Sequence, residues 1–524
     1  MNDKLSLRIY KVVCIAIILL VAGIRIHLAN IPFERDEGEY AYAGQMILKG
    51  SPPYHEVYNM KFPGVYFMYA LGFKMFGESI AATRYLTLLL QLMGAGFIFL
   101  LGRRLIHPLA AWLAAATFML FNLTLALQGI QSNAEHFVVA FLMPSLYFLY
   151  RGLEEESAID LATSGALLAT ACLMKQHAFL FGLATVPWIV YVQRTRAFKY
   201  LLAYAAGGVL PVVLMFAYLW HVGVWDRFYF LTIQYAHEYV NIAPFKPAMQ
   251  QFYPAQHDGN NISALLVWFG FASALGLVLP SKNGKARLFL LLLLVASVAS
   301  VMPGFFFRRH YFLMMLPGLS LLFTYTAFTV ASYFSDRHRL AVLSAYVVAS
   351  AAFFLGYEHT LLFNTPVEQV TEAMYPGTPF GAAGQIAGYI KNHSAPTDRI
   401  CMIGAEPQIF FLSQRKSASG YIYIYPLLEN QKYAPVMTDE FIAQSEQAKP
   451  AILLYSSKAL FEDGYNRDSK LYTWFANFKN QYQLKAICTP ISTTDIRLMR
   501  FDTIAPIDTL PETVPQIRVY QRVK

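Results

Sequence analysis

The chain has 524 residues, of which 56% are hydrophobic and only 14% are charged. A soluble domain of ordinary composition carries roughly 25% charged residues, so most of this chain is expected to lie in a bilayer. The net charge of +9 could indicate nucleic-acid binding, but the basic residues fall in short clusters between apolar segments, as topology determinants do. We therefore expect a polytopic membrane protein with membrane lipids around it and no nucleic-acid partner.

Eleven segments are apolar and long enough to cross roughly 30 Å of hydrocarbon. The first, residues 9–29, follows basic residues and has no small-residue cleavage site, so we interpret it as a retained helix rather than a signal peptide. Residues 63–77 form a shorter apolar segment that includes Lys74 and is not one of the eleven; it is expected to lie in the interface or to be half inserted. The other predicted spans are residues 84–102, 108–127, 134–151, 160–175, 178–192, 198–220, 263–280, 286–303, 311–334 and 338–357.

Clusters of basic residues between these spans predict the orientation of the chain. Positively charged loops remain in the cytoplasm, so the N-terminus is expected there and the C-terminus outside the inner (plasma) membrane. With this parity, the first loop (residues 30–83) and the loop 221–262 are also external. The clusters are Lys4, Arg8 and Lys11; Arg103 and Arg104; Arg194, Arg196 and Lys199; Lys282, Lys285 and Arg287; and Arg337 and Arg339.

The character of the sequence changes from about residue 364. Apolar runs become shorter, and stretches such as KPAILLYSS are typical of buried strands that alternate with helices. We therefore predict two domains, a mainly α transmembrane catalytic domain (residues 1–360) and an extracytoplasmic α/β domain (residues 361–524). The second has a normal domain size and no phosphate-binding glycine loop, so a structural or substrate-facing role is expected.

Four carboxylates fall within six positions directly after the first span, at Glu34, Asp36, Glu37 and Glu39. A short surface helix is predicted here, ending before Gly50. Acidic residues at a helix N-terminus ordinarily cap the helix or interact with its dipole. Four of them exceed what capping needs, so a catalytic use of this cluster is also expected.

Cations are predicted on the external side as well, against the usual charge bias of membrane proteins. Each one alone could be an anchor that extends its ammonium or guanidinium group to the interface. Together they indicate an anionic ligand at the membrane surface. The candidate phosphate-binding residues are Lys61, Arg84, Lys175, Arg308, Arg309 and His310.

Carboxylates beside cations at a lipid interface suit the attack of an acceptor hydroxyl or amine on a sugar carried by a lipid phosphate. A carboxylate would accept the proton of the nucleophile, and arginine or lysine would stabilise the charge that grows on the phosphate. This chemistry requires no cofactor and does not indicate a divalent metal. The four cysteines are too far apart in sequence to suggest a metal site.

Several motifs then carry a family resemblance, in this order along the chain: FERDEGEYAYAGQMILKGSPPY, NMKFPGVYFMYA, SNAEHF and RRHYFLMMLPGLSLL. They resemble motifs of the GT-C membrane glycosyltransferases. The sequence is most similar to bacterial members of the dolichyl-phosphate-mannose protein mannosyltransferase family, glycosyltransferase family 39, which also includes aminoarabinose transferases acting on lipid A. The resemblance covers roughly residues 9–360.

This resemblance implies a GT-C fold with about eleven transmembrane helices and an inverting transfer of a hexose or pentose. The donor would be an undecaprenyl- or dolichyl-phosphate sugar, and the acceptor a lipid, a glycan or a protein. Asp36 matches the essential acidic residue, Glu37 completes the acidic pair, and Glu135 matches a helper position in the second external loop. Lys61 matches a lysine that is a candidate phosphate contact. The acceptor or sugar is expected to contact Glu39, Tyr40 and Tyr58.

Two other function classes remain open from the residues. A transporter or flippase of anionic polyprenyl lipids would also need interfacial cations, but internal repeats and mid-membrane charges, its usual marks, are not evident. A non-catalytic envelope assembly protein would leave the acidic cluster unexplained.

Overall fold

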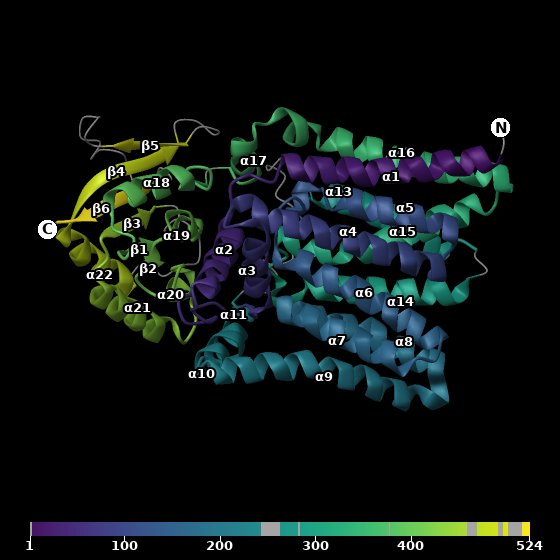
Figure 1. Ribbon diagram of the computed structural model, residues 1–524, viewed down its shortest axis with the longest axis horizontal. Coiled ribbons are helices and arrows are strands. Elements are labelled where there is room, and N and C mark those ends of the chain that lie inside the picture. Colours follow the sequence, from purple (N-terminus) through teal and green to yellow (C-terminus); the bar gives the residue numbers. More distant parts are fainter. Residues whose placement is uncertain are drawn as a thin grey trace.

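The structure, a computed structural model, describes residues 3–242, 262–280, 283–376, 378–457, 469–490, 496–500 and 516–523. Long helices form a bundle at one end of the molecule, and a mixed sheet with its own helices lies at the other (Figure 1). Two short helices of the first loop stand between these parts, across the bundle axis (Figure 1). Most of the predicted external loop 221–262, from residue 243 to residue 261, lies outside the described residues.

Every predicted span coincides with a helix of the bundle, as expected from the length of its apolar run. Seven segments of the described residues are helical, apolar and long enough to cross a membrane, and three further apolar helices are shorter. The protein therefore has a multi-pass membrane architecture, while the number of eleven crossings stays a prediction. The bundle helices are α1 (Asp3–His27), α4 (Ile80–Leu105), α5 (Pro108–Phe121), α6 (Ala134–Glu154), α7 (Ala158–Met174), α8 (Gly182–Gln193), α9 (Ala197–His221), α13 (Ile262–Val278), α14 (Gly284–Val301), α15 (Leu316–Ala331) and α16 (Asp336–Tyr357).

The basic clusters gather at the bundle end far from the sheet, where the N-terminus also lies (Figure 1). Arg104 at the end of α4 pairs with Glu154 at the end of α6, at 2.9 Å. The side chain of Asn283, before α14, donates to the Leu105 carbonyl at 3.0 Å. Lys282 and the side chain of Arg337 lie outside the described residues. The described clusters thus share one side, as the charge pattern predicts.

The first loop contains α2 (Arg35–Leu48) and α3 (Gly64–Phe76). At 1.5 Å per residue, the 13 residues of α3 extend about 20 Å, less than the hydrocarbon thickness. This length and its position across the bundle end agree with the expectation that residues 63–77 do not cross. Gly50, with φ of 85°, adopts a left-handed conformation that ends α2.

The C-terminal part (residues 361–524) contains a six-stranded sheet with the strand order β2-β1-β3-β6-β4-β5. The strands β2, β1 and β3 are parallel, whereas β6 pairs with β3 and β4 in antiparallel fashion. Helices alternate with the parallel strands, so the predicted α/β character is confirmed. The elements are α17 (Val367–Met374), α18 (Ala383–His393), β1 (Arg399–Ile403), α19 (Gln408–Ser413), β2 (Lys416–Ser417), α20 (Tyr425–Leu428), α21 (Ala434–Ala448), β3 (Ile452–Ser456), α22 (Lys470–Phe478), β4 (Tyr482–Pro490), β5 (Ile496–Arg500) and β6 (Ile517–Arg522).

Short helical pieces complete several of the connections between these elements. Two of these pieces, Phe230–Tyr235 and Thr360–Asn364, are π-helical. The α-helical pieces after α9 are α10 (Trp225–Tyr229) and α11 (Ala236–Val240). The 3₁₀ pieces are Leu125–Leu127, Gln176–Phe181, Arg194–Arg196, Pro303–Phe305, Arg309–Met315 and Lys479–Gln481.

The C-terminal part is packed directly onto the first loop. Arg35 donates to the Ala405 carbonyl at 3.0 Å, just after β1. A methyl group at Gly38 would lie 2.5 Å from the backbone nitrogen of Gln408, so α2 and α19 touch through backbone. The carboxyl end of β1 therefore faces the acidic cluster and positions it.

Candidate functional site

A cavity of about 600 Å³ opens where the bundle, the first loop and the C-terminal part meet. We call it the Asp36 cavity. Four of the twelve predicted site residues, Glu37, Glu39, Arg84 and Glu135, do not line it. The other eight do: Asp36, Tyr40, Tyr58, Lys61, Lys175, Arg308, Arg309 and His310.

A second cavity, of about 700 Å³, lies at the seam between the first loop, α10 and the C-terminal part. It shares Tyr58 with the Asp36 cavity but contains neither Asp36 nor Arg308. Its size alone does not make it the functional site. We assign the candidate site to the Asp36 cavity, because there a carboxylate meets several cations.

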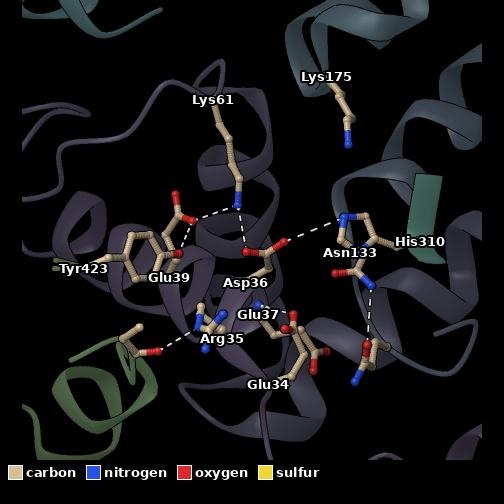
Figure 2. Close-up of polar contacts among 12 residues, drawn as sticks. Glu34, Arg35, Asp36, Glu37, Glu39, Lys61, Asn133, Lys175, His310 and Tyr423 are labelled. Carbon is tan, nitrogen blue, oxygen red and sulfur yellow. Dashed lines mark hydrogen bonds and ion pairs between the residues drawn. The ribbon is translucent and has the colours of Figure 1, made fainter. Parts of the chain in front are cut away.

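Asp36 is in the first turn of α2, with a quarter of its side chain exposed. Its Oδ1 lies 3.1 Å from Lys61 Nζ, and its Oδ2 lies 3.8 Å from His310 Nε2 (Figure 2). Burial by itself would raise the pKa of Asp36, but the charge of Lys61 and then that of His310 outweigh it and hold the pKa well below its usual range. Asp36 is therefore a carboxylate that can accept a proton.

Glu34 caps α2, because its side-chain Oε1 accepts a hydrogen bond from the backbone N–H of Glu37 at 2.9 Å. The ordinary explanation of the acidic cluster thus applies to one of its members. Burial, followed by the neighbouring charges of Asp36 and Glu37, raises the pKa of Glu34 to about 8. Asp36 has no capping role in this arrangement and is available for another function.

Glu39 lies beneath the cavity, with its side chain fully buried. Its Oε1 accepts a hydrogen bond from the Tyr66 hydroxyl at 2.7 Å, and its Oε2 accepts one from Lys61 Nζ at 2.8 Å. Tyr423 of the C-terminal part also donates its hydroxyl to Oε2 (Figure 2). The prediction that Glu39 contacts acceptor or sugar is therefore corrected, because its carboxylate is enclosed by protein donors.

Glu37 and Arg84 form a buried pair behind Asp36, with Arg84 Nη2 at 2.7 Å from Glu37 Oε2. The Ser132 N–H donates to the other oxygen of Glu37 at 2.9 Å, and Arg84 also donates to the carbonyls of Ala29 and Ile31. Arg84 is 4% exposed. The prediction that Arg84 binds the donor phosphate is corrected. Arg84 lies at the start of α4, and its buried guanidinium group binds Glu37 and backbone carbonyls instead of lining the cavity.

Glu135, in the first turn of α6, forms an ion pair with Lys175. Glu135 is 1% exposed, whereas Lys175 reaches the cavity. The Lys175 ammonium lies 3.5 Å from the centre of the Tyr311 ring. His310 joins this group, since its Nε2 is 3.9 Å from Glu135 and its Nδ1 is 2.8 Å from Gln128 Oε1. Glu135 thus does not line the cavity itself but contacts two side chains that do, Lys175 and His310.

Arg308 and Arg309 line the cavity without a carboxylate partner among the residues that the structure describes. The Arg308 guanidinium lies 5.5 Å from the centre of the Phe306 ring. The preceding backbone is strained, because Phe305 and Phe307 have φ of 51° and 44°. Bulky residues rarely adopt such values, and they concentrate at functional sites.

Sequence reasoning missed the contribution of the C-terminal part to the cavity, including its tyrosines. Tyr423 and Tyr425 line the cavity together with Glu429. Burial raises the pKa of Glu429 to about 6, although the Tyr235 hydroxyl and Arg308 partly offset it. The signal was visible as the alternating tyrosines of GYIYIYP, a pattern that places every second side chain on one side of an extended segment.

No group of three or more His, Cys, Asp or Glu side chains is arranged to hold a metal ion within the described ranges. The polar groups that line the cavity include carboxylates, ammonium and guanidinium groups, hydroxyls and an imidazole.

Comparisons with known proteins support the resemblance. The family model for dolichyl-phosphate-mannose-protein mannosyltransferases matches residues 60–221, whereas no curated protein sequence matches the chain. Among solved structures, ArnT from Cupriavidus metallidurans bound to undecaprenyl phosphate is similar, with a TM-score of 0.56, 15% identity and 97% of each chain covered. The Archaeoglobus fulgidus oligosaccharyltransferase tethered to an acceptor peptide has a TM-score of 0.51 and 10% identity, over 94% of this chain and 75% of that one.

At these identities the structural likeness defines the fold. The predicted GT-C fold, with a helical membrane part followed by a C-terminal part that contains a sheet, is confirmed. The predicted resemblance to the mannosyltransferase family is confirmed as well, directly in sequence over residues 60–221.

Proposed function

We propose that this protein is an inverting glycosyltransferase that moves a sugar from a polyprenyl-phosphate donor to an acceptor at the external face of the membrane. One observation carries the proposal. The Asp36 carboxylate lines the same cavity as two arginines that have no carboxylate partner among the described residues. A candidate general base and a candidate anion site thus line one cavity, at the end of the bundle that is nearest the sheet.

Charge balance indicates where the donor phosphate binds. Lys61 already contacts two carboxylates, and Lys175 contacts Glu135. Arg308 and Arg309 form no close ion pair with a described acidic side chain, although Asp36 and Glu429 lie near enough to interact with the charge of Arg308, so these arginines have the most charge left to attract the phosphate. Arginine also suits a phosphate geometrically, because its planar group donates two parallel hydrogen bonds.

The reaction follows from this placement. The acceptor oxygen or nitrogen attacks the anomeric carbon from the face opposite the phosphate, and its proton passes to Asp36. The bond between the anomeric carbon and the phosphate oxygen breaks, and its electron pair remains on the phosphate. The arginines stabilise that added charge. The products are an inverted glycoside and the polyprenyl phosphate.

Lys61 would adjust the basicity of Asp36 during this reaction. Without donor, Lys61 holds the pKa of Asp36 low, which makes a poor base. A phosphate that enters the cavity competes for the Lys61 ammonium, so the Asp36–Lys61 contact weakens and the pKa of Asp36 rises toward the working pH. A general base is most effective when these two values are close.

The comparisons support a lipid phosphate as part of the donor. The similar ArnT structure contains undecaprenyl phosphate, and an Archaeoglobus fulgidus oligosaccharyltransferase structure contains a dolichol phosphate and an inhibitory peptide. In this protein, lysine and arginine side chains line a cavity at the end of the bundle nearest the sheet, which is compatible with a ligand of that class.

Binding of undecaprenyl phosphate to the purified protein tests the proposal, together with mass spectrometry of envelope lipids in a deletion strain. We expect saturable binding that Arg308→Met weakens at least tenfold, and accumulation of a polyprenyl-phosphate sugar in the strain. Binding without accumulation would favour a flippase, and the absence of both would favour an assembly protein; either result overturns the transferase.

A further inference from the structure

We propose that Glu39 is a positioning residue, which Tyr423 of the C-terminal part completes, and that together they hold Lys61 against Asp36. This inference rests on the proposed function for its catalytic meaning. Its structural part does not depend on the proposed function: the docked C-terminal part would determine where the Lys61 ammonium lies.

Three donors converge on the Glu39 carboxylate from three different segments. Tyr66 comes from α3, Lys61 from the connection between α2 and α3, and Tyr423 from the segment before α20. The carboxylate has no exposed surface, so these protein groups replace water as its hydrogen-bond donors. A buried carboxylate with both oxygens occupied cannot rotate without losing a charge-assisted bond.

The bond from Tyr423 depends on how the C-terminal part is docked. The Tyr58 N–H of the first loop donates to the Gly420 carbonyl at 2.8 Å, and the Ile424 N–H donates to the Gly404 carbonyl at 3.1 Å. The segment that carries Tyr423 is therefore attached to the first loop on one side and to the end of β1 on the other. The contact between the Tyr423 hydroxyl and Glu39 therefore depends on the docking of the C-terminal part onto the first loop.

Glu39 gives Lys61 a second anionic contact besides Asp36. Burial by itself would lower the pKa of Lys61, but Asp36 and Glu39 together raise it well above its usual value. Without a fixed Glu39 carboxylate, the ammonium would contact a single carboxylate, and more of it would lose its proton at a given pH. The reactivity of Lys61 toward an acylating reagent therefore reports on the network.

The experiment measures acylation of Lys61 by acetic anhydride as a function of pH, by peptide mass spectrometry on the full-length protein. The variants are Tyr423→Phe and Glu39→Gln. The matched control is Tyr421→Phe, because the Tyr421 hydroxyl also donates to a carboxylate, Glu440 Oε2, at 2.7 Å, but does not contact Glu39. Melting temperature is recorded for each variant.

Glu39→Gln should increase the labelling rate about tenfold, which corresponds to one pKa unit, and Tyr423→Phe should increase it at least about threefold by the same relation. Tyr421→Phe should leave the rate unchanged. If Glu39→Gln does not fold, Tyr423→Phe alone decides. Equal rates for Tyr423→Phe and wild type, at equal melting temperature, would refute the inference.

Undecaprenyl phosphate binding separates this inference from the proposed function. We expect affinity about tenfold weaker in Tyr423→Phe than in wild type, equivalent to about 1.4 kcal/mol, because a Lys61 ammonium that Glu39 no longer holds at the cavity wall would contribute less charge to the phosphate site. If the wild-type protein does not bind undecaprenyl phosphate, the proposed function fails, whereas the labelling result still decides whether Tyr423 and Glu39 position Lys61. If a variant with altered Lys61 labelling binds undecaprenyl phosphate with wild-type affinity, the positioning of Lys61 does not contribute to donor binding.

Discussion

Asp36 and Glu37 are adjacent in the chain but lie in different surroundings. Asp36 faces the cavity, whereas Glu37 is enclosed with Arg84. We expect Asp36→Asn to lower turnover roughly 10²- to 10⁴-fold, because the amide preserves shape but cannot accept the proton. Turnover of a saturating polyprenyl-phosphate sugar by purified protein measures this effect. Melting temperature should remain unchanged, since Glu34 caps the helix.

Glu37→Gln is the neighbouring comparison for this variant. It removes the charge that balances buried Arg84, so its main effect should be a lower melting temperature. Near wild-type turnover by Asp36→Asn would refute the assignment of the base and would direct attention to Glu135.

Arg84 and Arg308 are both cations near the external end of the bundle, yet the structure gives them opposite tasks. Arg84→Met would leave Glu37 buried and unpaired, which costs about 3–5 kcal/mol of unfolding free energy. Arg308→Met should scarcely change stability but should weaken phosphate binding. Thermal unfolding and undecaprenyl phosphate titration of both variants separate the two roles; interchanged results would contradict both.

Glu34 predicts a pH dependence of stability. Its pKa is raised to about 8 in the folded protein, so the folded state binds more protons than the unfolded state above an unfolded pKa near roughly 4.3. The associated stability is complete at low pH and is lost as pH rises to about 8. The melting temperature of Glu34→Gln should therefore decline less than that of wild type between those limits. Parallel curves would argue against a protonated Glu34.

At the scale of elements, α7 and α9 touch through their backbones. A methyl group on Gly165 would lie 1.8 Å from the Tyr204 carbonyl oxygen, and one on Gly207 would lie 1.9 Å from that of Ala162. Small residues allow this close approach of membrane helices. Gly165→Ala should therefore separate the helices and lower the melting temperature clearly.

Gly96→Ala, in α4, is the matched control, because a methyl group there meets nothing within 4 Å. Alanine also has the higher helix propensity, so this variant should be neutral or slightly stabilising. An equal loss of stability in both variants would contradict the packing explanation.

At the scale of the whole molecule, the basic clusters lie at one end of the bundle and the Asp36 cavity lies at the other. The positive-inside rule then predicts that the cavity is external. Reporters fused after Arg104 and after Asn364 should report the cytoplasm and the exterior, respectively. An external Arg104 fusion would reverse this orientation.

The sequence by itself determined the membrane class, the helix positions and the acidic cluster. Each is a local property: an apolar run long enough to span lipid becomes a helix because its backbone must satisfy its own hydrogen bonds. The external loop motif was similarly readable from adjacent residues, and it placed Asp36 and Lys61 in one segment. The alternating tyrosines of GYIYIYP form a local pattern, but Glu39, which Tyr423 contacts, is too distant in the sequence to be inferred from it.

Only the tertiary structure decided which charges face the cavity. Glu37 and Arg84 are 47 positions apart and Glu39 and Tyr423 are 384 apart, and no local pattern reports whether such side chains meet. Arg84 and Arg308 look equivalent in sequence, but one is enclosed by a carboxylate and carbonyl oxygens and the other is not. The reason is physical: the energy of a charge depends on the groups that surround it, and those groups come together only through folding.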